Sequence, residues 1–137
     1  MLIHKVRDGR FYFAEVVLAV DSAVAYLEIV FECSGKGFLG QGSIEDVPAS
    51  GYEDWRAGAR AGVSFALAAV GATTARVVVQ RISGLSTDTN PTVVAVAAAH
   101  AVWNGLGVSP PSAASAQLER MMFSSGLRPA DEVPSFT

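Results

Sequence analysis

The chain has 137 residues, of which 50% are hydrophobic and 17% are charged, and its net charge is −3. This length suits one compact domain, and the apolar composition argues against disorder. The acidic balance argues against a DNA-binding protein, which usually carries a basic stripe. A single cysteine, Cys33, excludes an internal disulfide and a multi-cysteine metal site. We expect one domain over residues 1–127, a tail at 128–137, no membrane span, no secretory signal and a cytoplasmic location.

Two alternating segments predict strands of an antiparallel sheet with one buried side. The segment from Phe11 to Val20 carries only apolar residues on one face, namely Tyr12, Ala14, Val16, Leu18 and Val20. The segment from Tyr26 to Cys33 directs Leu27, Ile29, Phe31 and Cys33 to one side. We expect the Cys33 thiol to be buried and inert. The glycine-rich stretch 34–42 predicts a hairpin loop, since it lacks the Gly-Lys-Ser/Thr ending of a P-loop.

A first helix is predicted from Tyr52 to Val70, where apolar and small residues recur at helical spacing. The expected buried stripe consists of Trp55, Ala59, Gly62, Val63, Ala66 and Val70. Gly58 and Gly62 weaken a helix intrinsically, so we expect both where this helix closely approaches the sheet or a second helix.

The segment from Arg76 to Leu106 is the most informative part of the chain. Its β-branched run from Arg76 to Ile82 predicts a strand, and a polar stretch follows. A helix is then predicted to begin near Asn90, which suits the N-cap, or Pro91, which suits the first turn. Because no charged residue occurs from position 89 to 118, this helix must be buried on most sides. Residues 112–123 predict a third, short helix. The predicted core contains Leu27, Ile29, Phe31, Val63, Ala66, Val94, Ala97 and Ala101.

The stretch from Tyr26 to Gly107 resembles the fourth domain of elongation factor G, a member of the ribosomal protein S5 domain 2-like superfamily. The matching features are the strand 26–32, Val47-Pro48 before a helix, and a strand-turn-helix unit that ends in the small residues 97–101. The resemblance implies an α+β fold with a four-stranded sheet, two main helices on one face and a left-handed βαβ crossover, to which a short C-terminal helix is added. The family's ribosome-facing tip corresponds to Gly84 to Asn90, where Thr87 lies near the position of the family's histidine.

The polar turn before the second long helix is the candidate ligand site. Its residues combine hydroxyl groups with the free amides of a helix start: Ser86, Thr87, Asp88, Thr89 and Asn90. The alternative is that these residues serve turn and capping chemistry alone. His100 and Asn104 share a helix face, and a buried hydrogen-bonded histidine explains them more simply than a catalytic pair. We expect no cofactor and no metal site.

The charge-free helix also predicts an apolar surface that a second copy of the chain would cover. Its expected interface residues are Val102, Trp103, Leu106, Leu118, Met121 and Met122. The alternative is that the short third helix folds back as a lid.

Two functional hypotheses follow. The first is a non-catalytic interaction module, like a freestanding elongation factor G domain, that binds a protein, RNA or its own copy. The second is a small enzyme or ligand-binding protein that uses residues 86–90.

Overall fold

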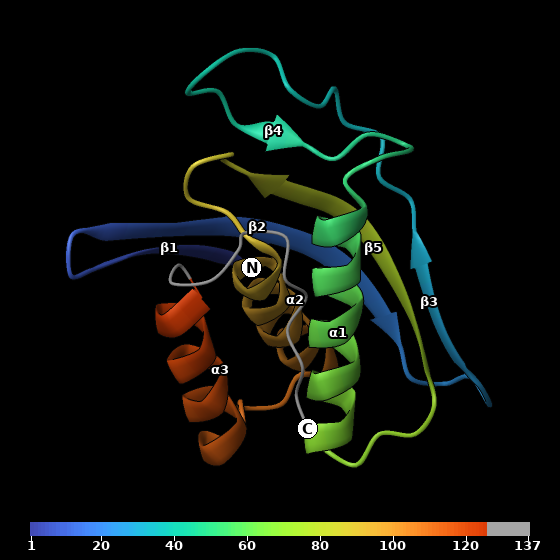
Figure 1. Ribbon diagram of the computed structural model, residues 1–137. Helices are drawn as coiled ribbons and strands as arrows, with labels where there is room; N and C mark the ends of the chain where they lie inside the picture. Colours follow the sequence, from blue (N-terminus) through green and yellow to red (C-terminus); the bar gives the residue numbers. More distant parts are fainter. Residues whose placement is uncertain (126–137) are drawn as a thin grey trace.

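The computed structural model describes residues 1–125, which form an α+β fold of five strands and three helices (Figure 1). In chain order the elements are β1 (Leu2–Arg7), β2 (Arg10–Asp21), β3 (Leu27–Phe31), β4 (Glu45–Asp46), α1 (Glu53–Ala69), β5 (Ala75–Gly84), α2 (Pro91–Leu106) and α3 (Ser112–Ser125). The predicted boundary between domain and tail at 127/128 lies outside the described residues. Among the described helices, none has the length and apolarity needed to span a bilayer.

The sheet has the strand order β1-β2-β5-β3, with the short β4 paired to the far end of β5. The expected count of four strands is therefore wrong by one. The sequence prediction missed β1, which pairs antiparallel with β2 through a tight turn at Asp8 and Gly9. Both turn residues have positive φ, 53° and 76°. An Asp-Gly pair suits such a two-residue hairpin because both positions tolerate this conformation.

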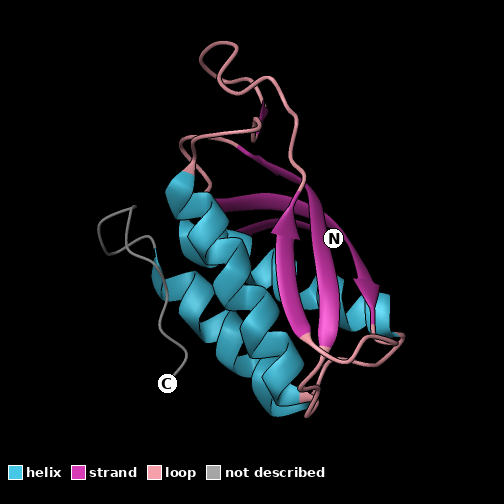
Figure 2. Cartoon of the chain, turned by 90° about the vertical axis from the view of Figure 1, so that its right-hand side faces the viewer, coloured by secondary structure: helices cyan, strands magenta, loops and turns pink. Residues whose placement is uncertain are grey.

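The connection from β3 through α1 to β5 joins two parallel, neighbouring strands. Viewed with α1 in front of the sheet and both strands running upward, the chain passes from β3 on the right to β5 on the left (Figure 1). The orthogonal view places α1 on the same side of these strands (Figure 2). This arrangement is a left-handed crossover, the rare hand for parallel strands, and it is the hand that the elongation factor resemblance implies.

A bulge in β5 changes which of its residues face the helices. Val17 of β2 lies opposite Arg81, whereas Leu18 lies opposite Val79, so Gln80 has no partner in β2. An extra residue of this kind shifts the alternation of side chains by one position. Val79 and Ile82 are consequently both fully buried although they are three positions apart.

The two long helices pack closely through glycines, which is one of the two close contacts that the sequence allowed. A Cβ atom on Gly58 would overlap the carbonyl oxygen of Pro91, and one on Gly62 would overlap that of Ala95. The backbones of α1 and α2 therefore touch along two successive turns. Helix α2 is buried on nearly all sides, between α1, β2 and α3. Its N-cap is Asn90, as predicted, and its C-cap is Gly107 in the left-handed conformation, which the sequence prediction did not name.

Two burial predictions need correction. Leu27, expected in the core, is 55% exposed and begins the edge strand β3. Phe31 is half-buried against the core, and the guanidinium groups of Arg56 and Arg60 lie over its ring at 5.7 and 5.1 Å from the ring centroid. The remaining predicted core residues are buried or pack against the core: Ile29, Val63, Ala66, Val94, Ala97 and Ala101.

The predicted dimer surface on α2 and α3 is also corrected. Four of its residues are buried within the chain itself, namely Val102, Trp103, Leu118 and Met122. Leu106 and Met121 are half-buried. Helix α3 runs beside α2 and supplies the lid that the sequence left as the alternative (Figure 1). The Trp103 indole Nε1 donates a hydrogen bond to the carbonyl oxygen of Ala66 at 3.0 Å, which satisfies its polar atom in the core.

Candidate functional site

The polar turn Ser86–Asn90 continues alongside β2 where β5 ends. Phe13 in β2 donates its backbone N–H to the carbonyl oxygen of Asp88 at 3.0 Å. The Thr89 hydroxyl donates to the carbonyl oxygen of Phe13 at 2.6 Å and accepts from the amide of Leu85 at 2.7 Å. Thr89 is therefore a buried structural residue that fixes the turn to the sheet.

Asn90 also uses its side chain within the fold. Its Oδ1 accepts from the amide of Val93 at 2.9 Å, the expected N-cap bond, and its Nδ2 donates to the Ser125 hydroxyl at 2.9 Å. The amide of Val94 is taken by the carbonyl oxygen of Asn90. Asn90 therefore occupies the amides of Val93 and Val94, two of the backbone groups that were expected to be free for a ligand. The five predicted residues are adjacent, but Thr89 and Asn90 serve the fold first.

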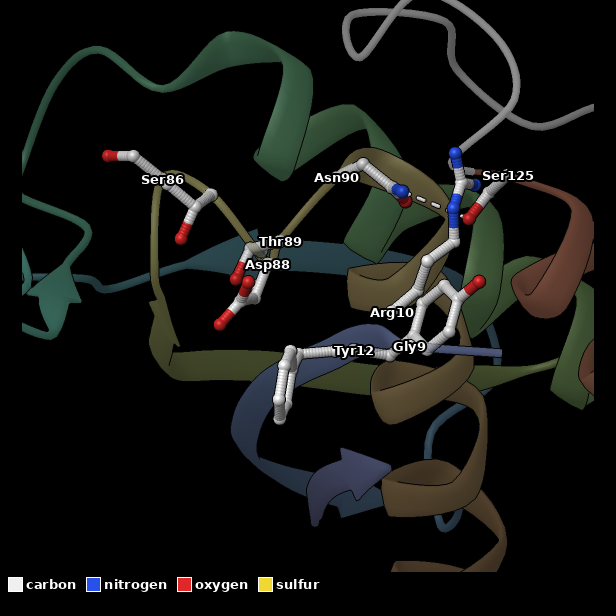
Figure 3. A pocket seen from close by; sticks show the side chains of 10 residues that line it. Gly9, Arg10, Tyr12, Ser86, Asp88, Thr89, Asn90 and Ser125 are labelled. Atoms are coloured by element: carbon white, nitrogen blue, oxygen red, sulfur yellow. Dashed lines mark hydrogen bonds between the residues drawn. The ribbon is translucent and has the colours of Figure 1, made fainter. Parts of the chain in front are cut away.

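On one side of this turn lies a pocket of about 360 Å³, called here the Arg10 pocket (Figure 3). Its lining combines the hairpin tip, the polar turn and the end of α3: Gly9, Arg10, Phe11, Tyr12, Ser86, Thr87, Asp88, Thr89, Asn90 and Ser125. The Arg10 Nη1 atom is buried and has no hydrogen-bond partner among residues 1–125. Neither Arg10 nor Asp88 forms a salt bridge with another described residue. The pocket therefore contains one cation and one anion that form no ion pair within residues 1–125.

On the other side of the turn lies a second pocket of about 380 Å³, formed around Glu45. The Glu45 carboxylate is buried and accepts hydrogen bonds from the hydroxyl groups of Tyr52, at 2.7 Å, and Ser86. Burial, followed by the bond to Glu45 and the charge of Glu45, raises the pKa of Tyr52 to about 12. The phenol stays protonated near neutral pH and cannot serve as a base there. Ser86, predicted as a ligand residue, is bound to this buried carboxylate.

The remaining candidates from the sequence do not form a catalytic group. His100 is half-buried, with its ring edge-on to Trp103 at 5.1 Å between centroids, whereas Asn104 is exposed. Burial and the nearby Lys5 lower the pKa of His100, so its ring is neutral near physiological pH. Burial raises the pKa of the Cys33 thiol, in agreement with the expected inert cysteine. Within residues 1–125, no cluster of three or more potential metal-binding side chains occurs.

The chain was compared with family models, curated proteins and solved structures. None of them matches. A functional assignment therefore rests on the geometry. The sequence led to the polar turn but missed the residues that the fold brings to it, above all Arg10 and Glu45. The Asp8-Gly9 pair was the one sequence signal for the position of Arg10. Such a pair predicts a hairpin, and Arg10 begins the second strand of that hairpin.

Proposed function

We propose that this protein is a non-catalytic interaction module whose binding surface is the outer face of the sheet, opposite the helices. The residues on the helix side of β2 are buried, including Tyr12, Ala14 and Val16. The alternate residues of the same strand face outward, and the register aligns them with alternate residues of β1. No helix of the described part packs there, so this face is available to a partner.

One observation carries the proposal: the outer face is apolar along β1 and the start of β2, where a solvated sheet face would be polar. Leu2, Val6 and Phe11 are 51%, 58% and 56% exposed. Val6 and Phe11 are direct cross-strand partners, and the next outward pair is His4 and Phe13. Their exposed surface is therefore contiguous, and patches of this kind mark interaction sites more often than isolated apolar residues do.

The charges on this face favour a second copy of the chain over RNA. Arg81 pairs with Glu15 at 2.5 Å and Arg76 pairs with Glu28 at 3.2 Å. Both arginines are paired with carboxylates within the molecule, so they offer little free positive charge to a phosphate backbone. An apolar face with balanced charges is compatible with an identical face across a two-fold axis. The proposed dimer thus keeps the expected self-association but moves it from the helices to the sheet.

The molar mass in solution tests this proposal. Light scattering during size-exclusion chromatography should give the mass of two chains at high micromolar concentration. Val6→Lys and Leu2→Lys should each shift the protein to the mass of one chain, because a buried unpaired ammonium group is costly. Leu39→Lys is the matched control, since Leu39 is 66% exposed but lies in the loop before β4.

The expected control result is an unchanged dimer with Leu39→Lys. Circular dichroism of each variant should match that of the wild type, which separates loss of the dimer from loss of the fold. A wild-type mass of one chain over the whole concentration range would contradict the proposal, as would equal dissociation by Leu39→Lys.

A further inference from the structure

Arg10 supplies the positive charge of the Arg10 pocket. Its Nη1 atom is buried and has no partner in the described part of the chain, and in Figure 3 its guanidinium group lies beside the side chains of Asn90 and Ser125. Those two side chains are already bonded to each other, and the Ser125 hydroxyl donates to the carbonyl oxygen of Met122 at 2.6 Å. A buried donor without an acceptor is costly, and a charged donor more so. An anionic group in the pocket would remove this cost.

Asp88 supplies the opposite charge in the same pocket. Its backbone is held by Phe13 and by the turn bond from its own amide to the carbonyl oxygen of Leu85 at 3.0 Å. Its carboxylate forms no salt bridge within residues 1–125. In Figure 3 this carboxylate and the Arg10 guanidinium lie at opposite sides of the pocket. A dianion such as inorganic phosphate would be repelled by Asp88, whereas a ligand with an amino group at its other end would be attracted.

From this pair of charges we infer that the Arg10 pocket binds a small zwitterion, a molecule whose carboxylate and amino group are separated by a few bonds. The carboxylate pairs with the guanidinium of Arg10, whose planar fork suits a carboxylate. The amino group pairs with the Asp88 carboxylate. The volume of about 360 Å³ falls at the lower end of small-molecule sites, which begin near about 300 Å³. Phe11 belongs both to the lining of this pocket and to the apolar patch proposed for the dimer, and the two proposals are tested with different variants.

A matched set of three probes tests the assignment: γ-aminobutyrate with both charges, butyrate with the carboxylate alone, and butylamine with the amino group alone. Binding is followed by backbone amide shifts in NMR spectra. We expect saturable shifts at Gly9, Arg10 and Asp88 with γ-aminobutyrate. Loss of either charge should weaken binding by roughly tenfold, the effect of about 1.4 kcal/mol.

Two variants separate the roles of the charges. Arg10→Gln should weaken γ-aminobutyrate and butyrate alike by roughly tenfold or more. Asp88→Asn should reduce γ-aminobutyrate to the affinity of butyrate and should not weaken butyrate, because this change only removes a negative charge. Arg7→Gln is the control, because Arg7 belongs to the same hairpin but lies over the Phe123 ring, and it should change nothing in the pocket.

Three outcomes would overturn the inference. The first is the absence of pocket shifts with γ-aminobutyrate at tens of millimolar in a folded protein. The second is wild-type affinity in Arg10→Gln. The third is inorganic phosphate that binds more tightly than γ-aminobutyrate and does not respond to Asp88→Asn, which would assign an anion site of another class.

Discussion

Tyr52 combines an unusual backbone with an unusual side-chain environment. Its φ is 54°, a left-handed conformation that residues with side chains adopt infrequently, and it stands at the N-cap of α1 without a side-chain cap bond. The bond from its hydroxyl to Glu45 and the tilted contact with Trp55 at 5.0 Å hold it there. The residue therefore links β4 to the start of α1.

The raised pKa of Tyr52 predicts a loss of stability in alkaline solution. The pKa is about 12 in the folded chain and 10.0 in an ordinary tyrosine. The folded state thus holds the proton more tightly, so this stabilisation is complete below pH 10.0 and is lost as the pH rises toward about 12. We expect Tyr52→Phe to reduce the fall in unfolding free energy over this window, measured by urea denaturation. Tyr26→Phe, at an exposed tyrosine, should keep the wild-type slope.

Among the elements, α1 and α2 depend on each other through glycine contacts. Gly62 faces the carbonyl oxygen of Ala95, so a methyl group there must push the helices apart. Alanine favours a helix over glycine by about 1 kcal/mol, but overpacking of this kind costs about 1–3 kcal/mol and prevails. We expect Gly62→Ala to lower the unfolding free energy. Ser64→Ala on the exposed side of α1 should raise it by a few tenths of a kcal/mol, and stabilisation by both changes would refute the close contact.

Helix α3 covers the core, so truncation of one of its buried side chains should lower the free energy of unfolding. Leu118 and Met122 are buried together with Val102 and Trp103. Leu118→Ala should lower the unfolding free energy by about 2–5 kcal/mol through lost burial and a cavity. Glu119→Ala, at an exposed position of the same helix, should change it by less than about 0.5 kcal/mol. Equal effects of the two changes would mean that α3 does not cover the core.

At the scale of the whole molecule, the sheet has one face against the helices and one face open. If a second copy covers the open face, folding and association are linked, and the melting temperature rises with protein concentration. We expect this rise in the wild type and its loss in Val6→Lys, measured by scanning calorimetry. High salt should not abolish the rise, because salt screens exposed charges and leaves apolar contacts in place. A melting temperature independent of concentration in both proteins would contradict the dimer.

The helices could be predicted from the sequence because their signals are local. Asn90 and Pro91 define the start of α2 by capping chemistry that involves only nearby backbone groups. Gly58 and Gly62 identified the contact face of α1, since glycines at this spacing serve little purpose in a helix except close approach. The position of the polar turn was predictable for the same reason.

Tertiary structure alone decided the rest. Strict alternation would place Val79 and Ile82 on opposite faces of β5, yet both are buried because of the bulge at Gln80. The pairing with β2 determines where this bulge occurs. Helix α3 covers the part of α2 that contains Trp103. The apolar pattern of the sequence was equally compatible with cover by a second copy of the chain. Arg10 reaches Asn90 only through the hairpin of β1 and β2. Such contacts join residues far apart in the chain, and the free energy that selects them comes from burial in the whole fold rather than from local propensity.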